Sequence, residues 1–211
     1  GSPAFNAGQN PDEPVDLDLQ GDPRIQELVI DLGPYEGLFQ EIPESILYVD
    51  ASATGQATGE SWEDAFSNLQ DALQAAVAGD TLHVAEGTYY PDEGGGWSNN
   101  DRLATFRLQS GVALLGGFPV GGGDSAERNP AANRTMLSGD IDQDDGADFA
   151  NNSGNSFTVV AAEEVGSSAI LDGFVITAGN ADGTTLIETR GGGMFCSRDA
   201  NPVIRNCTFL S

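Results

Sequence analysis

The sequence predicts an all-β fold, a right-handed parallel β-helix (solenoid) with an amphipathic capping helix near its N-terminal side. The prediction starts from a recurring motif, from 28 glycines in 211 residues, and from one amphipathic stretch that precedes the motif. A motif that returns every ~20–50 residues is typical of a solenoid. Each copy has an apolar pair, a small or Asx residue and more apolar residues; the copies are residues 114–118, 136–140, 170–174 and 204–208.

Each copy reads as a strand, a corner and a second strand. Asp172 and Asn206 occupy the same place in their copies, and such residues tolerate the left-handed backbone of a sharp corner. Further short strands are expected at 106–108, 157–160 and 194–196. We therefore expect about four or five coils, right-handed as parallel crossovers are, with Leu115, Leu137 and Leu171 stacked in one inward column.

The segment before the solenoid predicts a strand at 46–50, a helix at 61–78 and strands at 80–84 and 87–89. Ser61 can cap the helix, since Asp64 follows three residues later. Gly79 supplies the stop. Apolar residues between Trp62 and Ala76 recur at helical spacing on one face. Such a helix could cover the first coil and block edge pairing there.

The charge of the chain excludes several partners. The formal net charge is −25, and all eight basic residues are arginines. A chain of this charge repels nucleic acid and anionic membrane surfaces. No apolar run approaches the ~18 residues of a membrane span, so we expect no membrane insertion. Two explanations of the charge stay open: a solvated acidic surface adapted to salt, or cation binding by clustered carboxylates.

The chain resembles a known family at residues 46–50, in the helix up to Gly79, and at 79–89. It also does so at Gly116-Gly117-Phe118, at 137–140, at 191–194 and at 201–209. These stretches look like the pectin-lyase-like parallel β-helix surface proteins of bacteria and archaea, related in style to polymorphic outer membrane proteins. The resemblance implies a right-handed β-helix over about residues 46–211. It leaves function open, because the fold carries both enzymes and inert surface proteins.

Residues 1–41 resemble the segment that closes such a β-helix at its C-terminal end, although here they come first. We therefore divide the chain into a closing or donor segment (1–41), an entry strand with capping helix and first coil (42–100), and coils that end open (101–211). The donor segment of one copy could pair with the last coil of the next. The expected assembly interface is Val29, Ile30, Leu32, Tyr35, Phe209 and Leu210. A slice through a longer tandem array is the alternative.

Catalytic residues are sparse. Lyases of this fold pair an arginine or lysine base with calcium-binding carboxylates, and related hydrolases use two or three aspartates. This chain has one histidine, His83, which we expect to point outward from a strand between Leu82 and Val84. Asp144 and Asp145 are adjacent, and neighbouring loop carboxylates rarely converge on one substrate. We therefore expect no enzymatic activity.

A calcium site is the metal hypothesis. Residues 140–146 place carboxylates at alternate positions before a glycine, and such a loop can wrap oxygen ligands around Ca²⁺. The alternative is a solvated acidic loop. The expected ligands are Asp140, Asp142 and Asp144 or Asp145.

Two kinds of covalent modification are also open. Cys196 and Cys207 could form a disulfide outside the cell, or could be two buried small side chains. Asn-x-Ser/Thr sequons occur at Asn133, Asn151 and Asn206, and the first two are the candidate glycosylation sites.

The leading functional hypothesis is a non-catalytic structural protein of the cell surface or extracellular space. Copies of it would self-assemble head to tail into a filament or surface array. The alternative is a carbohydrate-binding or polysaccharide-cleaving β-helix module of a larger surface protein. Tyr89, Tyr90 and Trp97, which lie in one region of the chain, favour surface polysaccharide as a partner.

Overall fold

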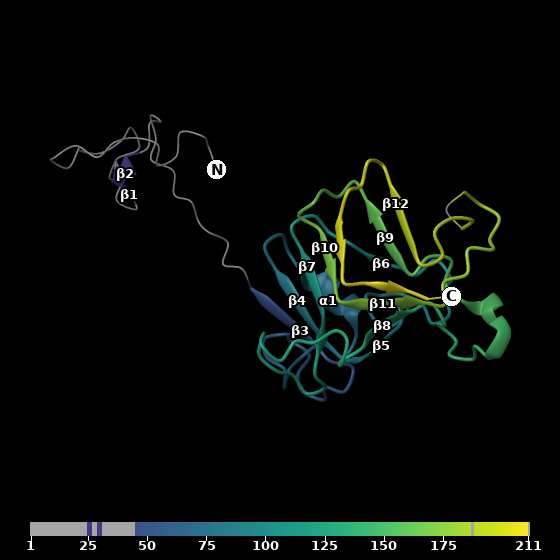
Figure 1. The fold of residues 1–211 in the computed structure, drawn as a ribbon, viewed down its shortest axis with the longest axis horizontal. Coiled ribbons are helices and arrows are strands. Elements are labelled where there is room, and N and C mark those ends of the chain that lie inside the picture. The colour runs from purple at the N-terminus through teal and green to yellow at the C-terminus, as the bar shows by residue number, and fades with distance from the viewer. Residues whose placement is uncertain (1–24, 27–28, 31–44, 187, 211) are drawn as a thin grey trace. The chain divides into compact units, whose positions relative to one another are not determined.

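A computed structural model describes residues 25–26, 29–30, 45–186 and 188–210 (Figure 1). The chain divides into two units, Gly1–Pro43 and Glu44–Ser211. In the first unit, strands β1 (Ile25–Gln26) and β2 (Val29–Ile30) pair antiparallel. Leu32 and Tyr35, which we assigned to the assembly interface, lie outside the described residues.

The second unit is a parallel β-solenoid, as the sequence predicts. Its strands form three sheets, and every pairing within them is parallel. Sheet 1 has five strands, one for each of about five turns. It contains β3 (Ile46–Val49), β4 (Thr81–Ala85), β7 (Ala113–Phe118), β10 (Ile170–Asp172) and β13 (Val203–Arg205).

Sheets 2 and 3 form the other two sides of the solenoid, with four and three strands (Figure 1). Sheet 2 contains β5 (Gly87–Tyr89), β8 (Thr135–Ser138), β11 (Phe174–Thr177) and β14 (Thr208–Phe209). Sheet 3 contains β6 (Phe106–Arg107), β9 (Val160–Glu163) and β12 (Met194–Ser197). The handedness of the coil stays a prediction.

The core consists of columns of side chains that stack from turn to turn. Leu82, Leu114 and Leu171 are in register in sheet 1, and each is at most 1% exposed. Leu115 pairs with His83 and Asp172 on the opposite face and is half-buried. The prediction that Leu115 shares a column with Leu137 and Leu171 is therefore wrong. A slip of one residue exchanges the two faces of a strand.

The corner prediction is also displaced by one residue. Asp172 pairs with Arg205, so the position equivalent to Asn206 is Gly173. Both corner residues have a positive φ, 87° at Gly173 and 51° at Asn206. A Cβ at Gly173 would lie 2.8 Å from the carbonyl oxygen of Gly116 in the turn below, so this corner needs glycine.

The helix is shorter than predicted. Helix α1 spans Leu69–Ala75, and Asn68 caps it by accepting a hydrogen bond from the Asp71 amide. Ser61 instead accepts from the Asp64 amide in a turn. The helix does not begin at Ser61 because this stretch pairs with β3: the Phe66 amide donates to Tyr48, and the Asp50 amide donates to Phe66. The role of α1 as an end cap stays a prediction.

Two short 3₁₀ helices, η1 (Ala147–Phe149) and η2 (Asn152–Gly154), lie in the long connection between β8 and β9. In the part of the chain that the structure describes, no helix has both the length and the apolar character to cross a membrane.

Candidate functional site

The outer face of sheet 3 carries a groove that runs across successive turns. Strand alternation directs Phe106 and Val160 into the core. Their neighbours Arg107, Ala161 and Phe195 are in register with one another on the outer face. Because neighbouring strands lie ~4.8 Å apart, this outward column follows the solenoid axis.

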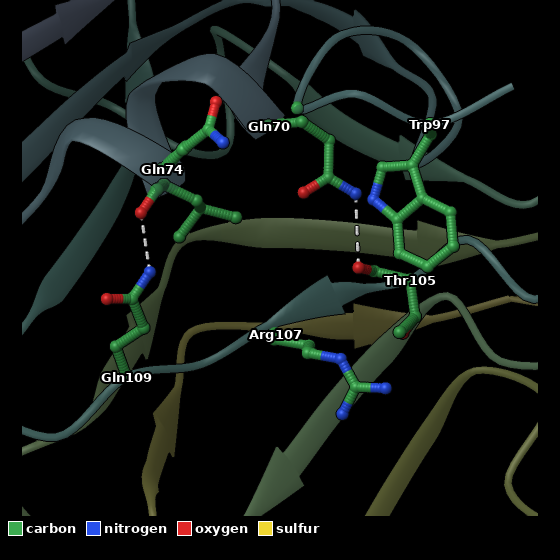
Figure 2. A pocket seen from close by; sticks show the side chains of 8 residues that line it. Gln70, Gln74, Trp97, Thr105, Arg107 and Gln109 are labelled. Atoms are coloured by element: carbon green, nitrogen blue, oxygen red, sulfur yellow. Dashed lines mark hydrogen bonds between the residues drawn. The ribbon is translucent and has the colours of Figure 1, made fainter.

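Two adjoining hollows make up this groove, which we call the sheet 3 groove. The larger, of about 530 Å³, lies over β6, β9 and β12. The smaller, of about 160 Å³, lies beside α1. Figure 2 shows the smaller hollow, where Trp97 stands over Thr105 and the Gln70 side chain reaches down from the helix to the Thr105 carbonyl oxygen, whereas the Gln74 carboxamide points the other way. The two hollows share Trp97, Thr105 and Arg107.

Arginines gather in this groove although the chain is strongly acidic. Arg102, Arg107 and Arg198, three of the eight arginines, line the larger hollow. Arg107 and Arg198 approach the same carboxylate, Glu163, at 3.4 and 3.1 Å. Their side chains stay 60% and 65% exposed. Arg198 also approaches Glu164 at 3.5 Å. A guanidinium group has five N–H donors, so these contacts leave donors free for an anionic or hydroxyl-rich ligand.

Arg102 is held in place by several contacts. Its guanidinium lies 4.0 Å from the centre of the Phe157 ring, over its face. It also donates to the carbonyl oxygens of Asn155 and Asn180 and pairs with Asp182. The hydrogen bond from Arg102 to Asp182, and the positive charge of Arg102, hold the pKa of Asp182 below its usual range. Arg102 therefore shapes the wall of the groove rather than offering free donors.

Apolar side chains form the rest of the groove. Phe157, Phe195 and Trp97 are half-buried in it. Leu103 and Leu186 are 54% and 69% exposed. Sequence reasoning found Trp97 but missed the phenylalanines, which are revealed only by the register of sheet 3. Tyr89 is 1% exposed and faces the core, so it is not part of an aromatic surface.

The acidic loop brings together three of the four aspartates expected to hold a metal. Carboxylate oxygens of Asp140, Asp144 and Asp145 all lie within 4.8 Å of one another. Asp140 Oδ1 accepts hydrogen bonds from the Asp144 amide at 3.0 Å and from the Asp145 amide at 3.4 Å. Asp142 is outside this trio, and its carboxylate is directed at Gly154, where an added Cβ would lie 2.0 Å from Oδ2.

The carboxylates of this loop repel one another. Partial desolvation and the charges of Asp142, Asp140 and Asp145 raise the pKa of Asp144. Glu93 lies beside the loop, where its carboxylate accepts from Gln143 Nε2 at 3.4 Å. Desolvation and the neighbouring Asp92 raise the pKa of Glu93 as well.

The two cysteines are free thiols, so the disulfide considered from the sequence is not formed. Cys196 is exposed on β12, whereas Cys207 is half-buried after β13 and donates to the carbonyl oxygen of Arg205. Desolvation raises the pKa of both thiols. These thiols are therefore poor nucleophiles at neutral pH.

The side-chain amides of the sequons are all in use. Asn133 donates to the Gly117 carbonyl oxygen, and Asn206 donates to Asp172. Asn151 is exposed in the acidic loop and donates to the carbonyl oxygen of Asp144. A glycan would replace one of the two amide hydrogens of its asparagine.

His83 lies outside the sheet 3 groove, on the outer face of sheet 1, where loops cover it. It is 7% exposed and stacks on Phe118, with ring centres 4.3 Å apart. Tyr48 meets it edge-on from the neighbouring strand. The side chain points away from the core, as expected, yet it faces neither hollow.

Comparison with known proteins gives no match: no family model, no curated protein and no solved structure matches the chain. The geometry of the groove and of the acidic loop therefore carries the functional argument.

Proposed function

We propose that this chain is a non-catalytic extracellular β-solenoid module that binds a linear polysaccharide in the sheet 3 groove. The observation that supports this is the outward column of Arg107, Ala161 and Phe195 along the solenoid axis, together with Trp97, which lines both hollows. An elongated groove that crosses equivalent positions on successive turns suits a polymer with a regular repeat.

The chemistry of the lining suits sugar. Aromatic side chains offer an apolar face and can pack against the C–H face of a sugar ring, while a few polar groups fix its orientation. Arginine guanidinium groups donate to hydroxyl or carboxylate oxygens, whereas the side-chain amides of Gln70 and Gln109 already donate to backbone carbonyl oxygens. The groove supplies both kinds of contact within about three turns.

The absence of catalysis is part of the proposal. Among the described groove residues, Glu163 is the carboxylate, and Arg107 and Arg198 both pair with it. Glycoside hydrolysis ordinarily needs two carboxylates on either side of the scissile bond. Incubation of the protein with a panel of polysaccharides should release no reducing ends and no unsaturated products.

Binding can be tested by affinity electrophoresis in gels that contain individual polysaccharides. We expect retardation of the native protein in at least one gel, and its loss in the variants W97A and F195A. F149A is the matched control, because Phe149 is an exposed aromatic residue outside the groove. Equal retardation of all four proteins, or none in any gel, would contradict the groove as a sugar site.

A second candidate function is self-assembly, favoured by the unpaired edge of the last turn. Among the described strands, β12, β13 and β14 each have a partner on one side only. Phe209 and Leu210 at this edge are 50% and 45% exposed. A strand from another copy could add here through backbone hydrogen bonds.

The opposite end is a poor partner for this edge. The chain between Gly59 and Phe66 already pairs with β3, so stacking one solenoid directly on another would have to displace it. The proposal therefore assigns the donor role to residues 1–41 of another copy, with Val29, Ile30, Leu32 and Tyr35 as the contact residues. Such a head-to-tail contact continues into a filament unless its geometry closes a ring.

We also propose that the chain belongs to the pectin-lyase-like surface proteins and is located at the cell surface. The parallel solenoid agrees with the resemblance to pectin-lyase-like surface proteins. A polysaccharide-binding module or filament subunit of that family acts at the cell surface. Immunolabelling of intact cells of the source organism tests this location.

A further inference from the structure

We propose that the acidic loop holds one divalent cation, with Ca²⁺ as the best-suited ion, between Asp140, Asp144 and Asp145, with Asn155 as a neutral oxygen donor beside them. This site is separate from the sheet 3 groove and does not depend on the proposed sugar binding.

The trio concentrates negative charge in one loop. Three carboxylates offer oxygens within 4.8 Å of one another. In the described part of the chain, no arginine or histidine forms an ion pair with any of them. The buried Asp172, by contrast, has Arg128 and Arg205 as partners. A cation would remove the repulsion that this loop otherwise carries.

A buried asparagine lies against the trio. Asn155 is 1% exposed, and its Nδ2 donates to Asp145 Oδ2 at 2.8 Å and to the Ala178 carbonyl oxygen at 2.8 Å. These two hydrogen bonds fix the orientation of the carboxamide and hold its amide group against Asp145. Its Oδ1 is buried and has no hydrogen-bond partner. A buried acceptor without a partner is destabilising, and a metal ion beside Asp145 would satisfy it.

A hollow lies beside the trio. Asp145 and Asn155 line one side of a polar hollow of about 680 Å³ between the acidic loop and the end of sheet 2. Asn152 and Asn180 also line it. Ca²⁺ takes six to eight oxygen ligands, including carboxylates, side-chain amide oxygens and waters. The hollow leaves room for the waters that three carboxylates and one amide do not replace.

The chemistry selects Ca²⁺ over Mg²⁺. Oxygen ligands on an irregular loop suit the flexible coordination of Ca²⁺, whereas Mg²⁺ requires a near-ideal octahedron and keeps several waters. Zn²⁺ is disfavoured because no described cysteine or histidine belongs to the cluster.

The test is calorimetric titration of the whole chain with CaCl₂ alone, after dialysis against chelator and at fixed ionic strength. We expect one ion bound per chain and a melting temperature that rises with Ca²⁺. The variants D144N and D145N should bind at least about tenfold more weakly, because ligand charge sets affinity in such sites. Both side chains are exposed, so neither variant should unfold the chain.

D199N is the matched control, because Asp199 is equally exposed, lies outside the cluster, and has a positive φ that asparagine tolerates. It should bind Ca²⁺ as the native protein does. Equal weakening in D199N would show that Ca²⁺ only screens the net charge and would overturn the site. The absence of any saturable heat with the native protein would overturn it too. A third variant, N155S, tests the neutral donor: unchanged affinity would remove Asn155 from the site.

Discussion

Asp172 illustrates how this acidic chain keeps a carboxylate buried on the outer face of sheet 1. Its side chain is 4% exposed and pairs with Arg128 at 2.9 Å and Arg205 at 2.8 Å, while Asn206 donates to it at 2.8 Å. Burial disfavours its charged form, yet the hydrogen bonds from Asn206 and Arg128 outweigh this and lower the pKa of Asp172. The cluster joins β10 to β13 and to the loop before β8.

We predict that removing Arg128 and removing Arg205 from this cluster lower the free energy of unfolding by different amounts. R128A should lower the free energy of unfolding by about 3 kcal/mol, because it strips a buried carboxylate of a partner. R205A should cost about 1 kcal/mol or less, because the Arg205 side chain is 55% exposed. Urea denaturation of both variants measures the difference. Equal losses would show that burial of the arginine does not set the energy of the pair.

A second prediction at this scale concerns pH and His83. Desolvation, together with the positive charge of Arg128, lowers the pKa of His83 below 6.5. Between the lowered pKa and about 6.5, the unfolded chain binds more protons at this residue than the folded chain does. The free energy of unfolding should therefore fall as pH drops through this window.

The measurement compares native protein with H83Q by urea denaturation at about pH 7.5 and about pH 5.5. Other groups titrate in both proteins: the raised pKa of Glu93, for example, favours the folded state as pH falls. Only the change with pH in the difference between their free energies of unfolding is due to His83. A difference that is the same at both pH values would contradict the shifted pKa.

At the scale of strands, the parallel solenoid could be predicted from the sequence, but the exact register could not. The apolar runs around Leu114-Leu115 and Ile170-Leu171 place strands correctly. Two adjacent leucines, however, do not reveal which one faces inward. The register is fixed by the pairing of Leu171 with Leu114 and by the corner at Gly173, which depend on neighbouring turns.

The two candidate sites also differ in how far the sequence alone can predict them. The aspartate trio lies within six residues of chain, so local spacing drew attention to this loop, but it included Asp142, which lies outside the trio. The sheet 3 groove joins Trp97, Phe157 and Phe195 from three turns. Such a set becomes visible only when the register of the strands is known. The helix prediction failed at Ser61 because helical spacing from Trp62 onward also suits a loop that packs Phe66 against β3.

The register predicts different costs for two adjacent truncations. L114A should lower the free energy of unfolding by ~2–5 kcal/mol, because Leu114 is 1% exposed and its loss leaves a cavity. L115A should cost about 1 kcal/mol or less, because Leu115 lies on the outer face and is half-buried. Thermal and urea denaturation of both variants check the order. A larger loss for L115A would mean that β7 is one residue out of register.

At the scale of the whole molecule, the proposed head-to-tail assembly depends on the last turn that the structure describes. Its strands present unpaired backbone groups, and such an edge pairs with another chain unless it is covered. The column that includes Tyr89, Leu137 and Ile176 ends at Phe209, which is half exposed where the other three are buried. An added strand would bury Phe209 and Leu210 and would extend sheet 2 by one more rung.

The head-to-tail proposal predicts that two unrelated changes have the same effect. Deletion of residues 1–41 removes the donor, and the double variant F209K/L210K places charges on the acceptor edge, where lysine blocks strand addition. Light scattering over a range of concentrations, with electron microscopy of the same samples, should show filaments for the intact chain and monomers for both variants. V120K is the control, because Val120 is exposed to a similar degree, 55%, away from this edge. Filaments from the truncated chain would exclude the donor segment, and an intact chain that stays monomeric at high concentration would exclude assembly itself. If the edge variant alone assembles normally, the donor pairs elsewhere, because a strand cannot add to β14 without placing both lysines in the contact.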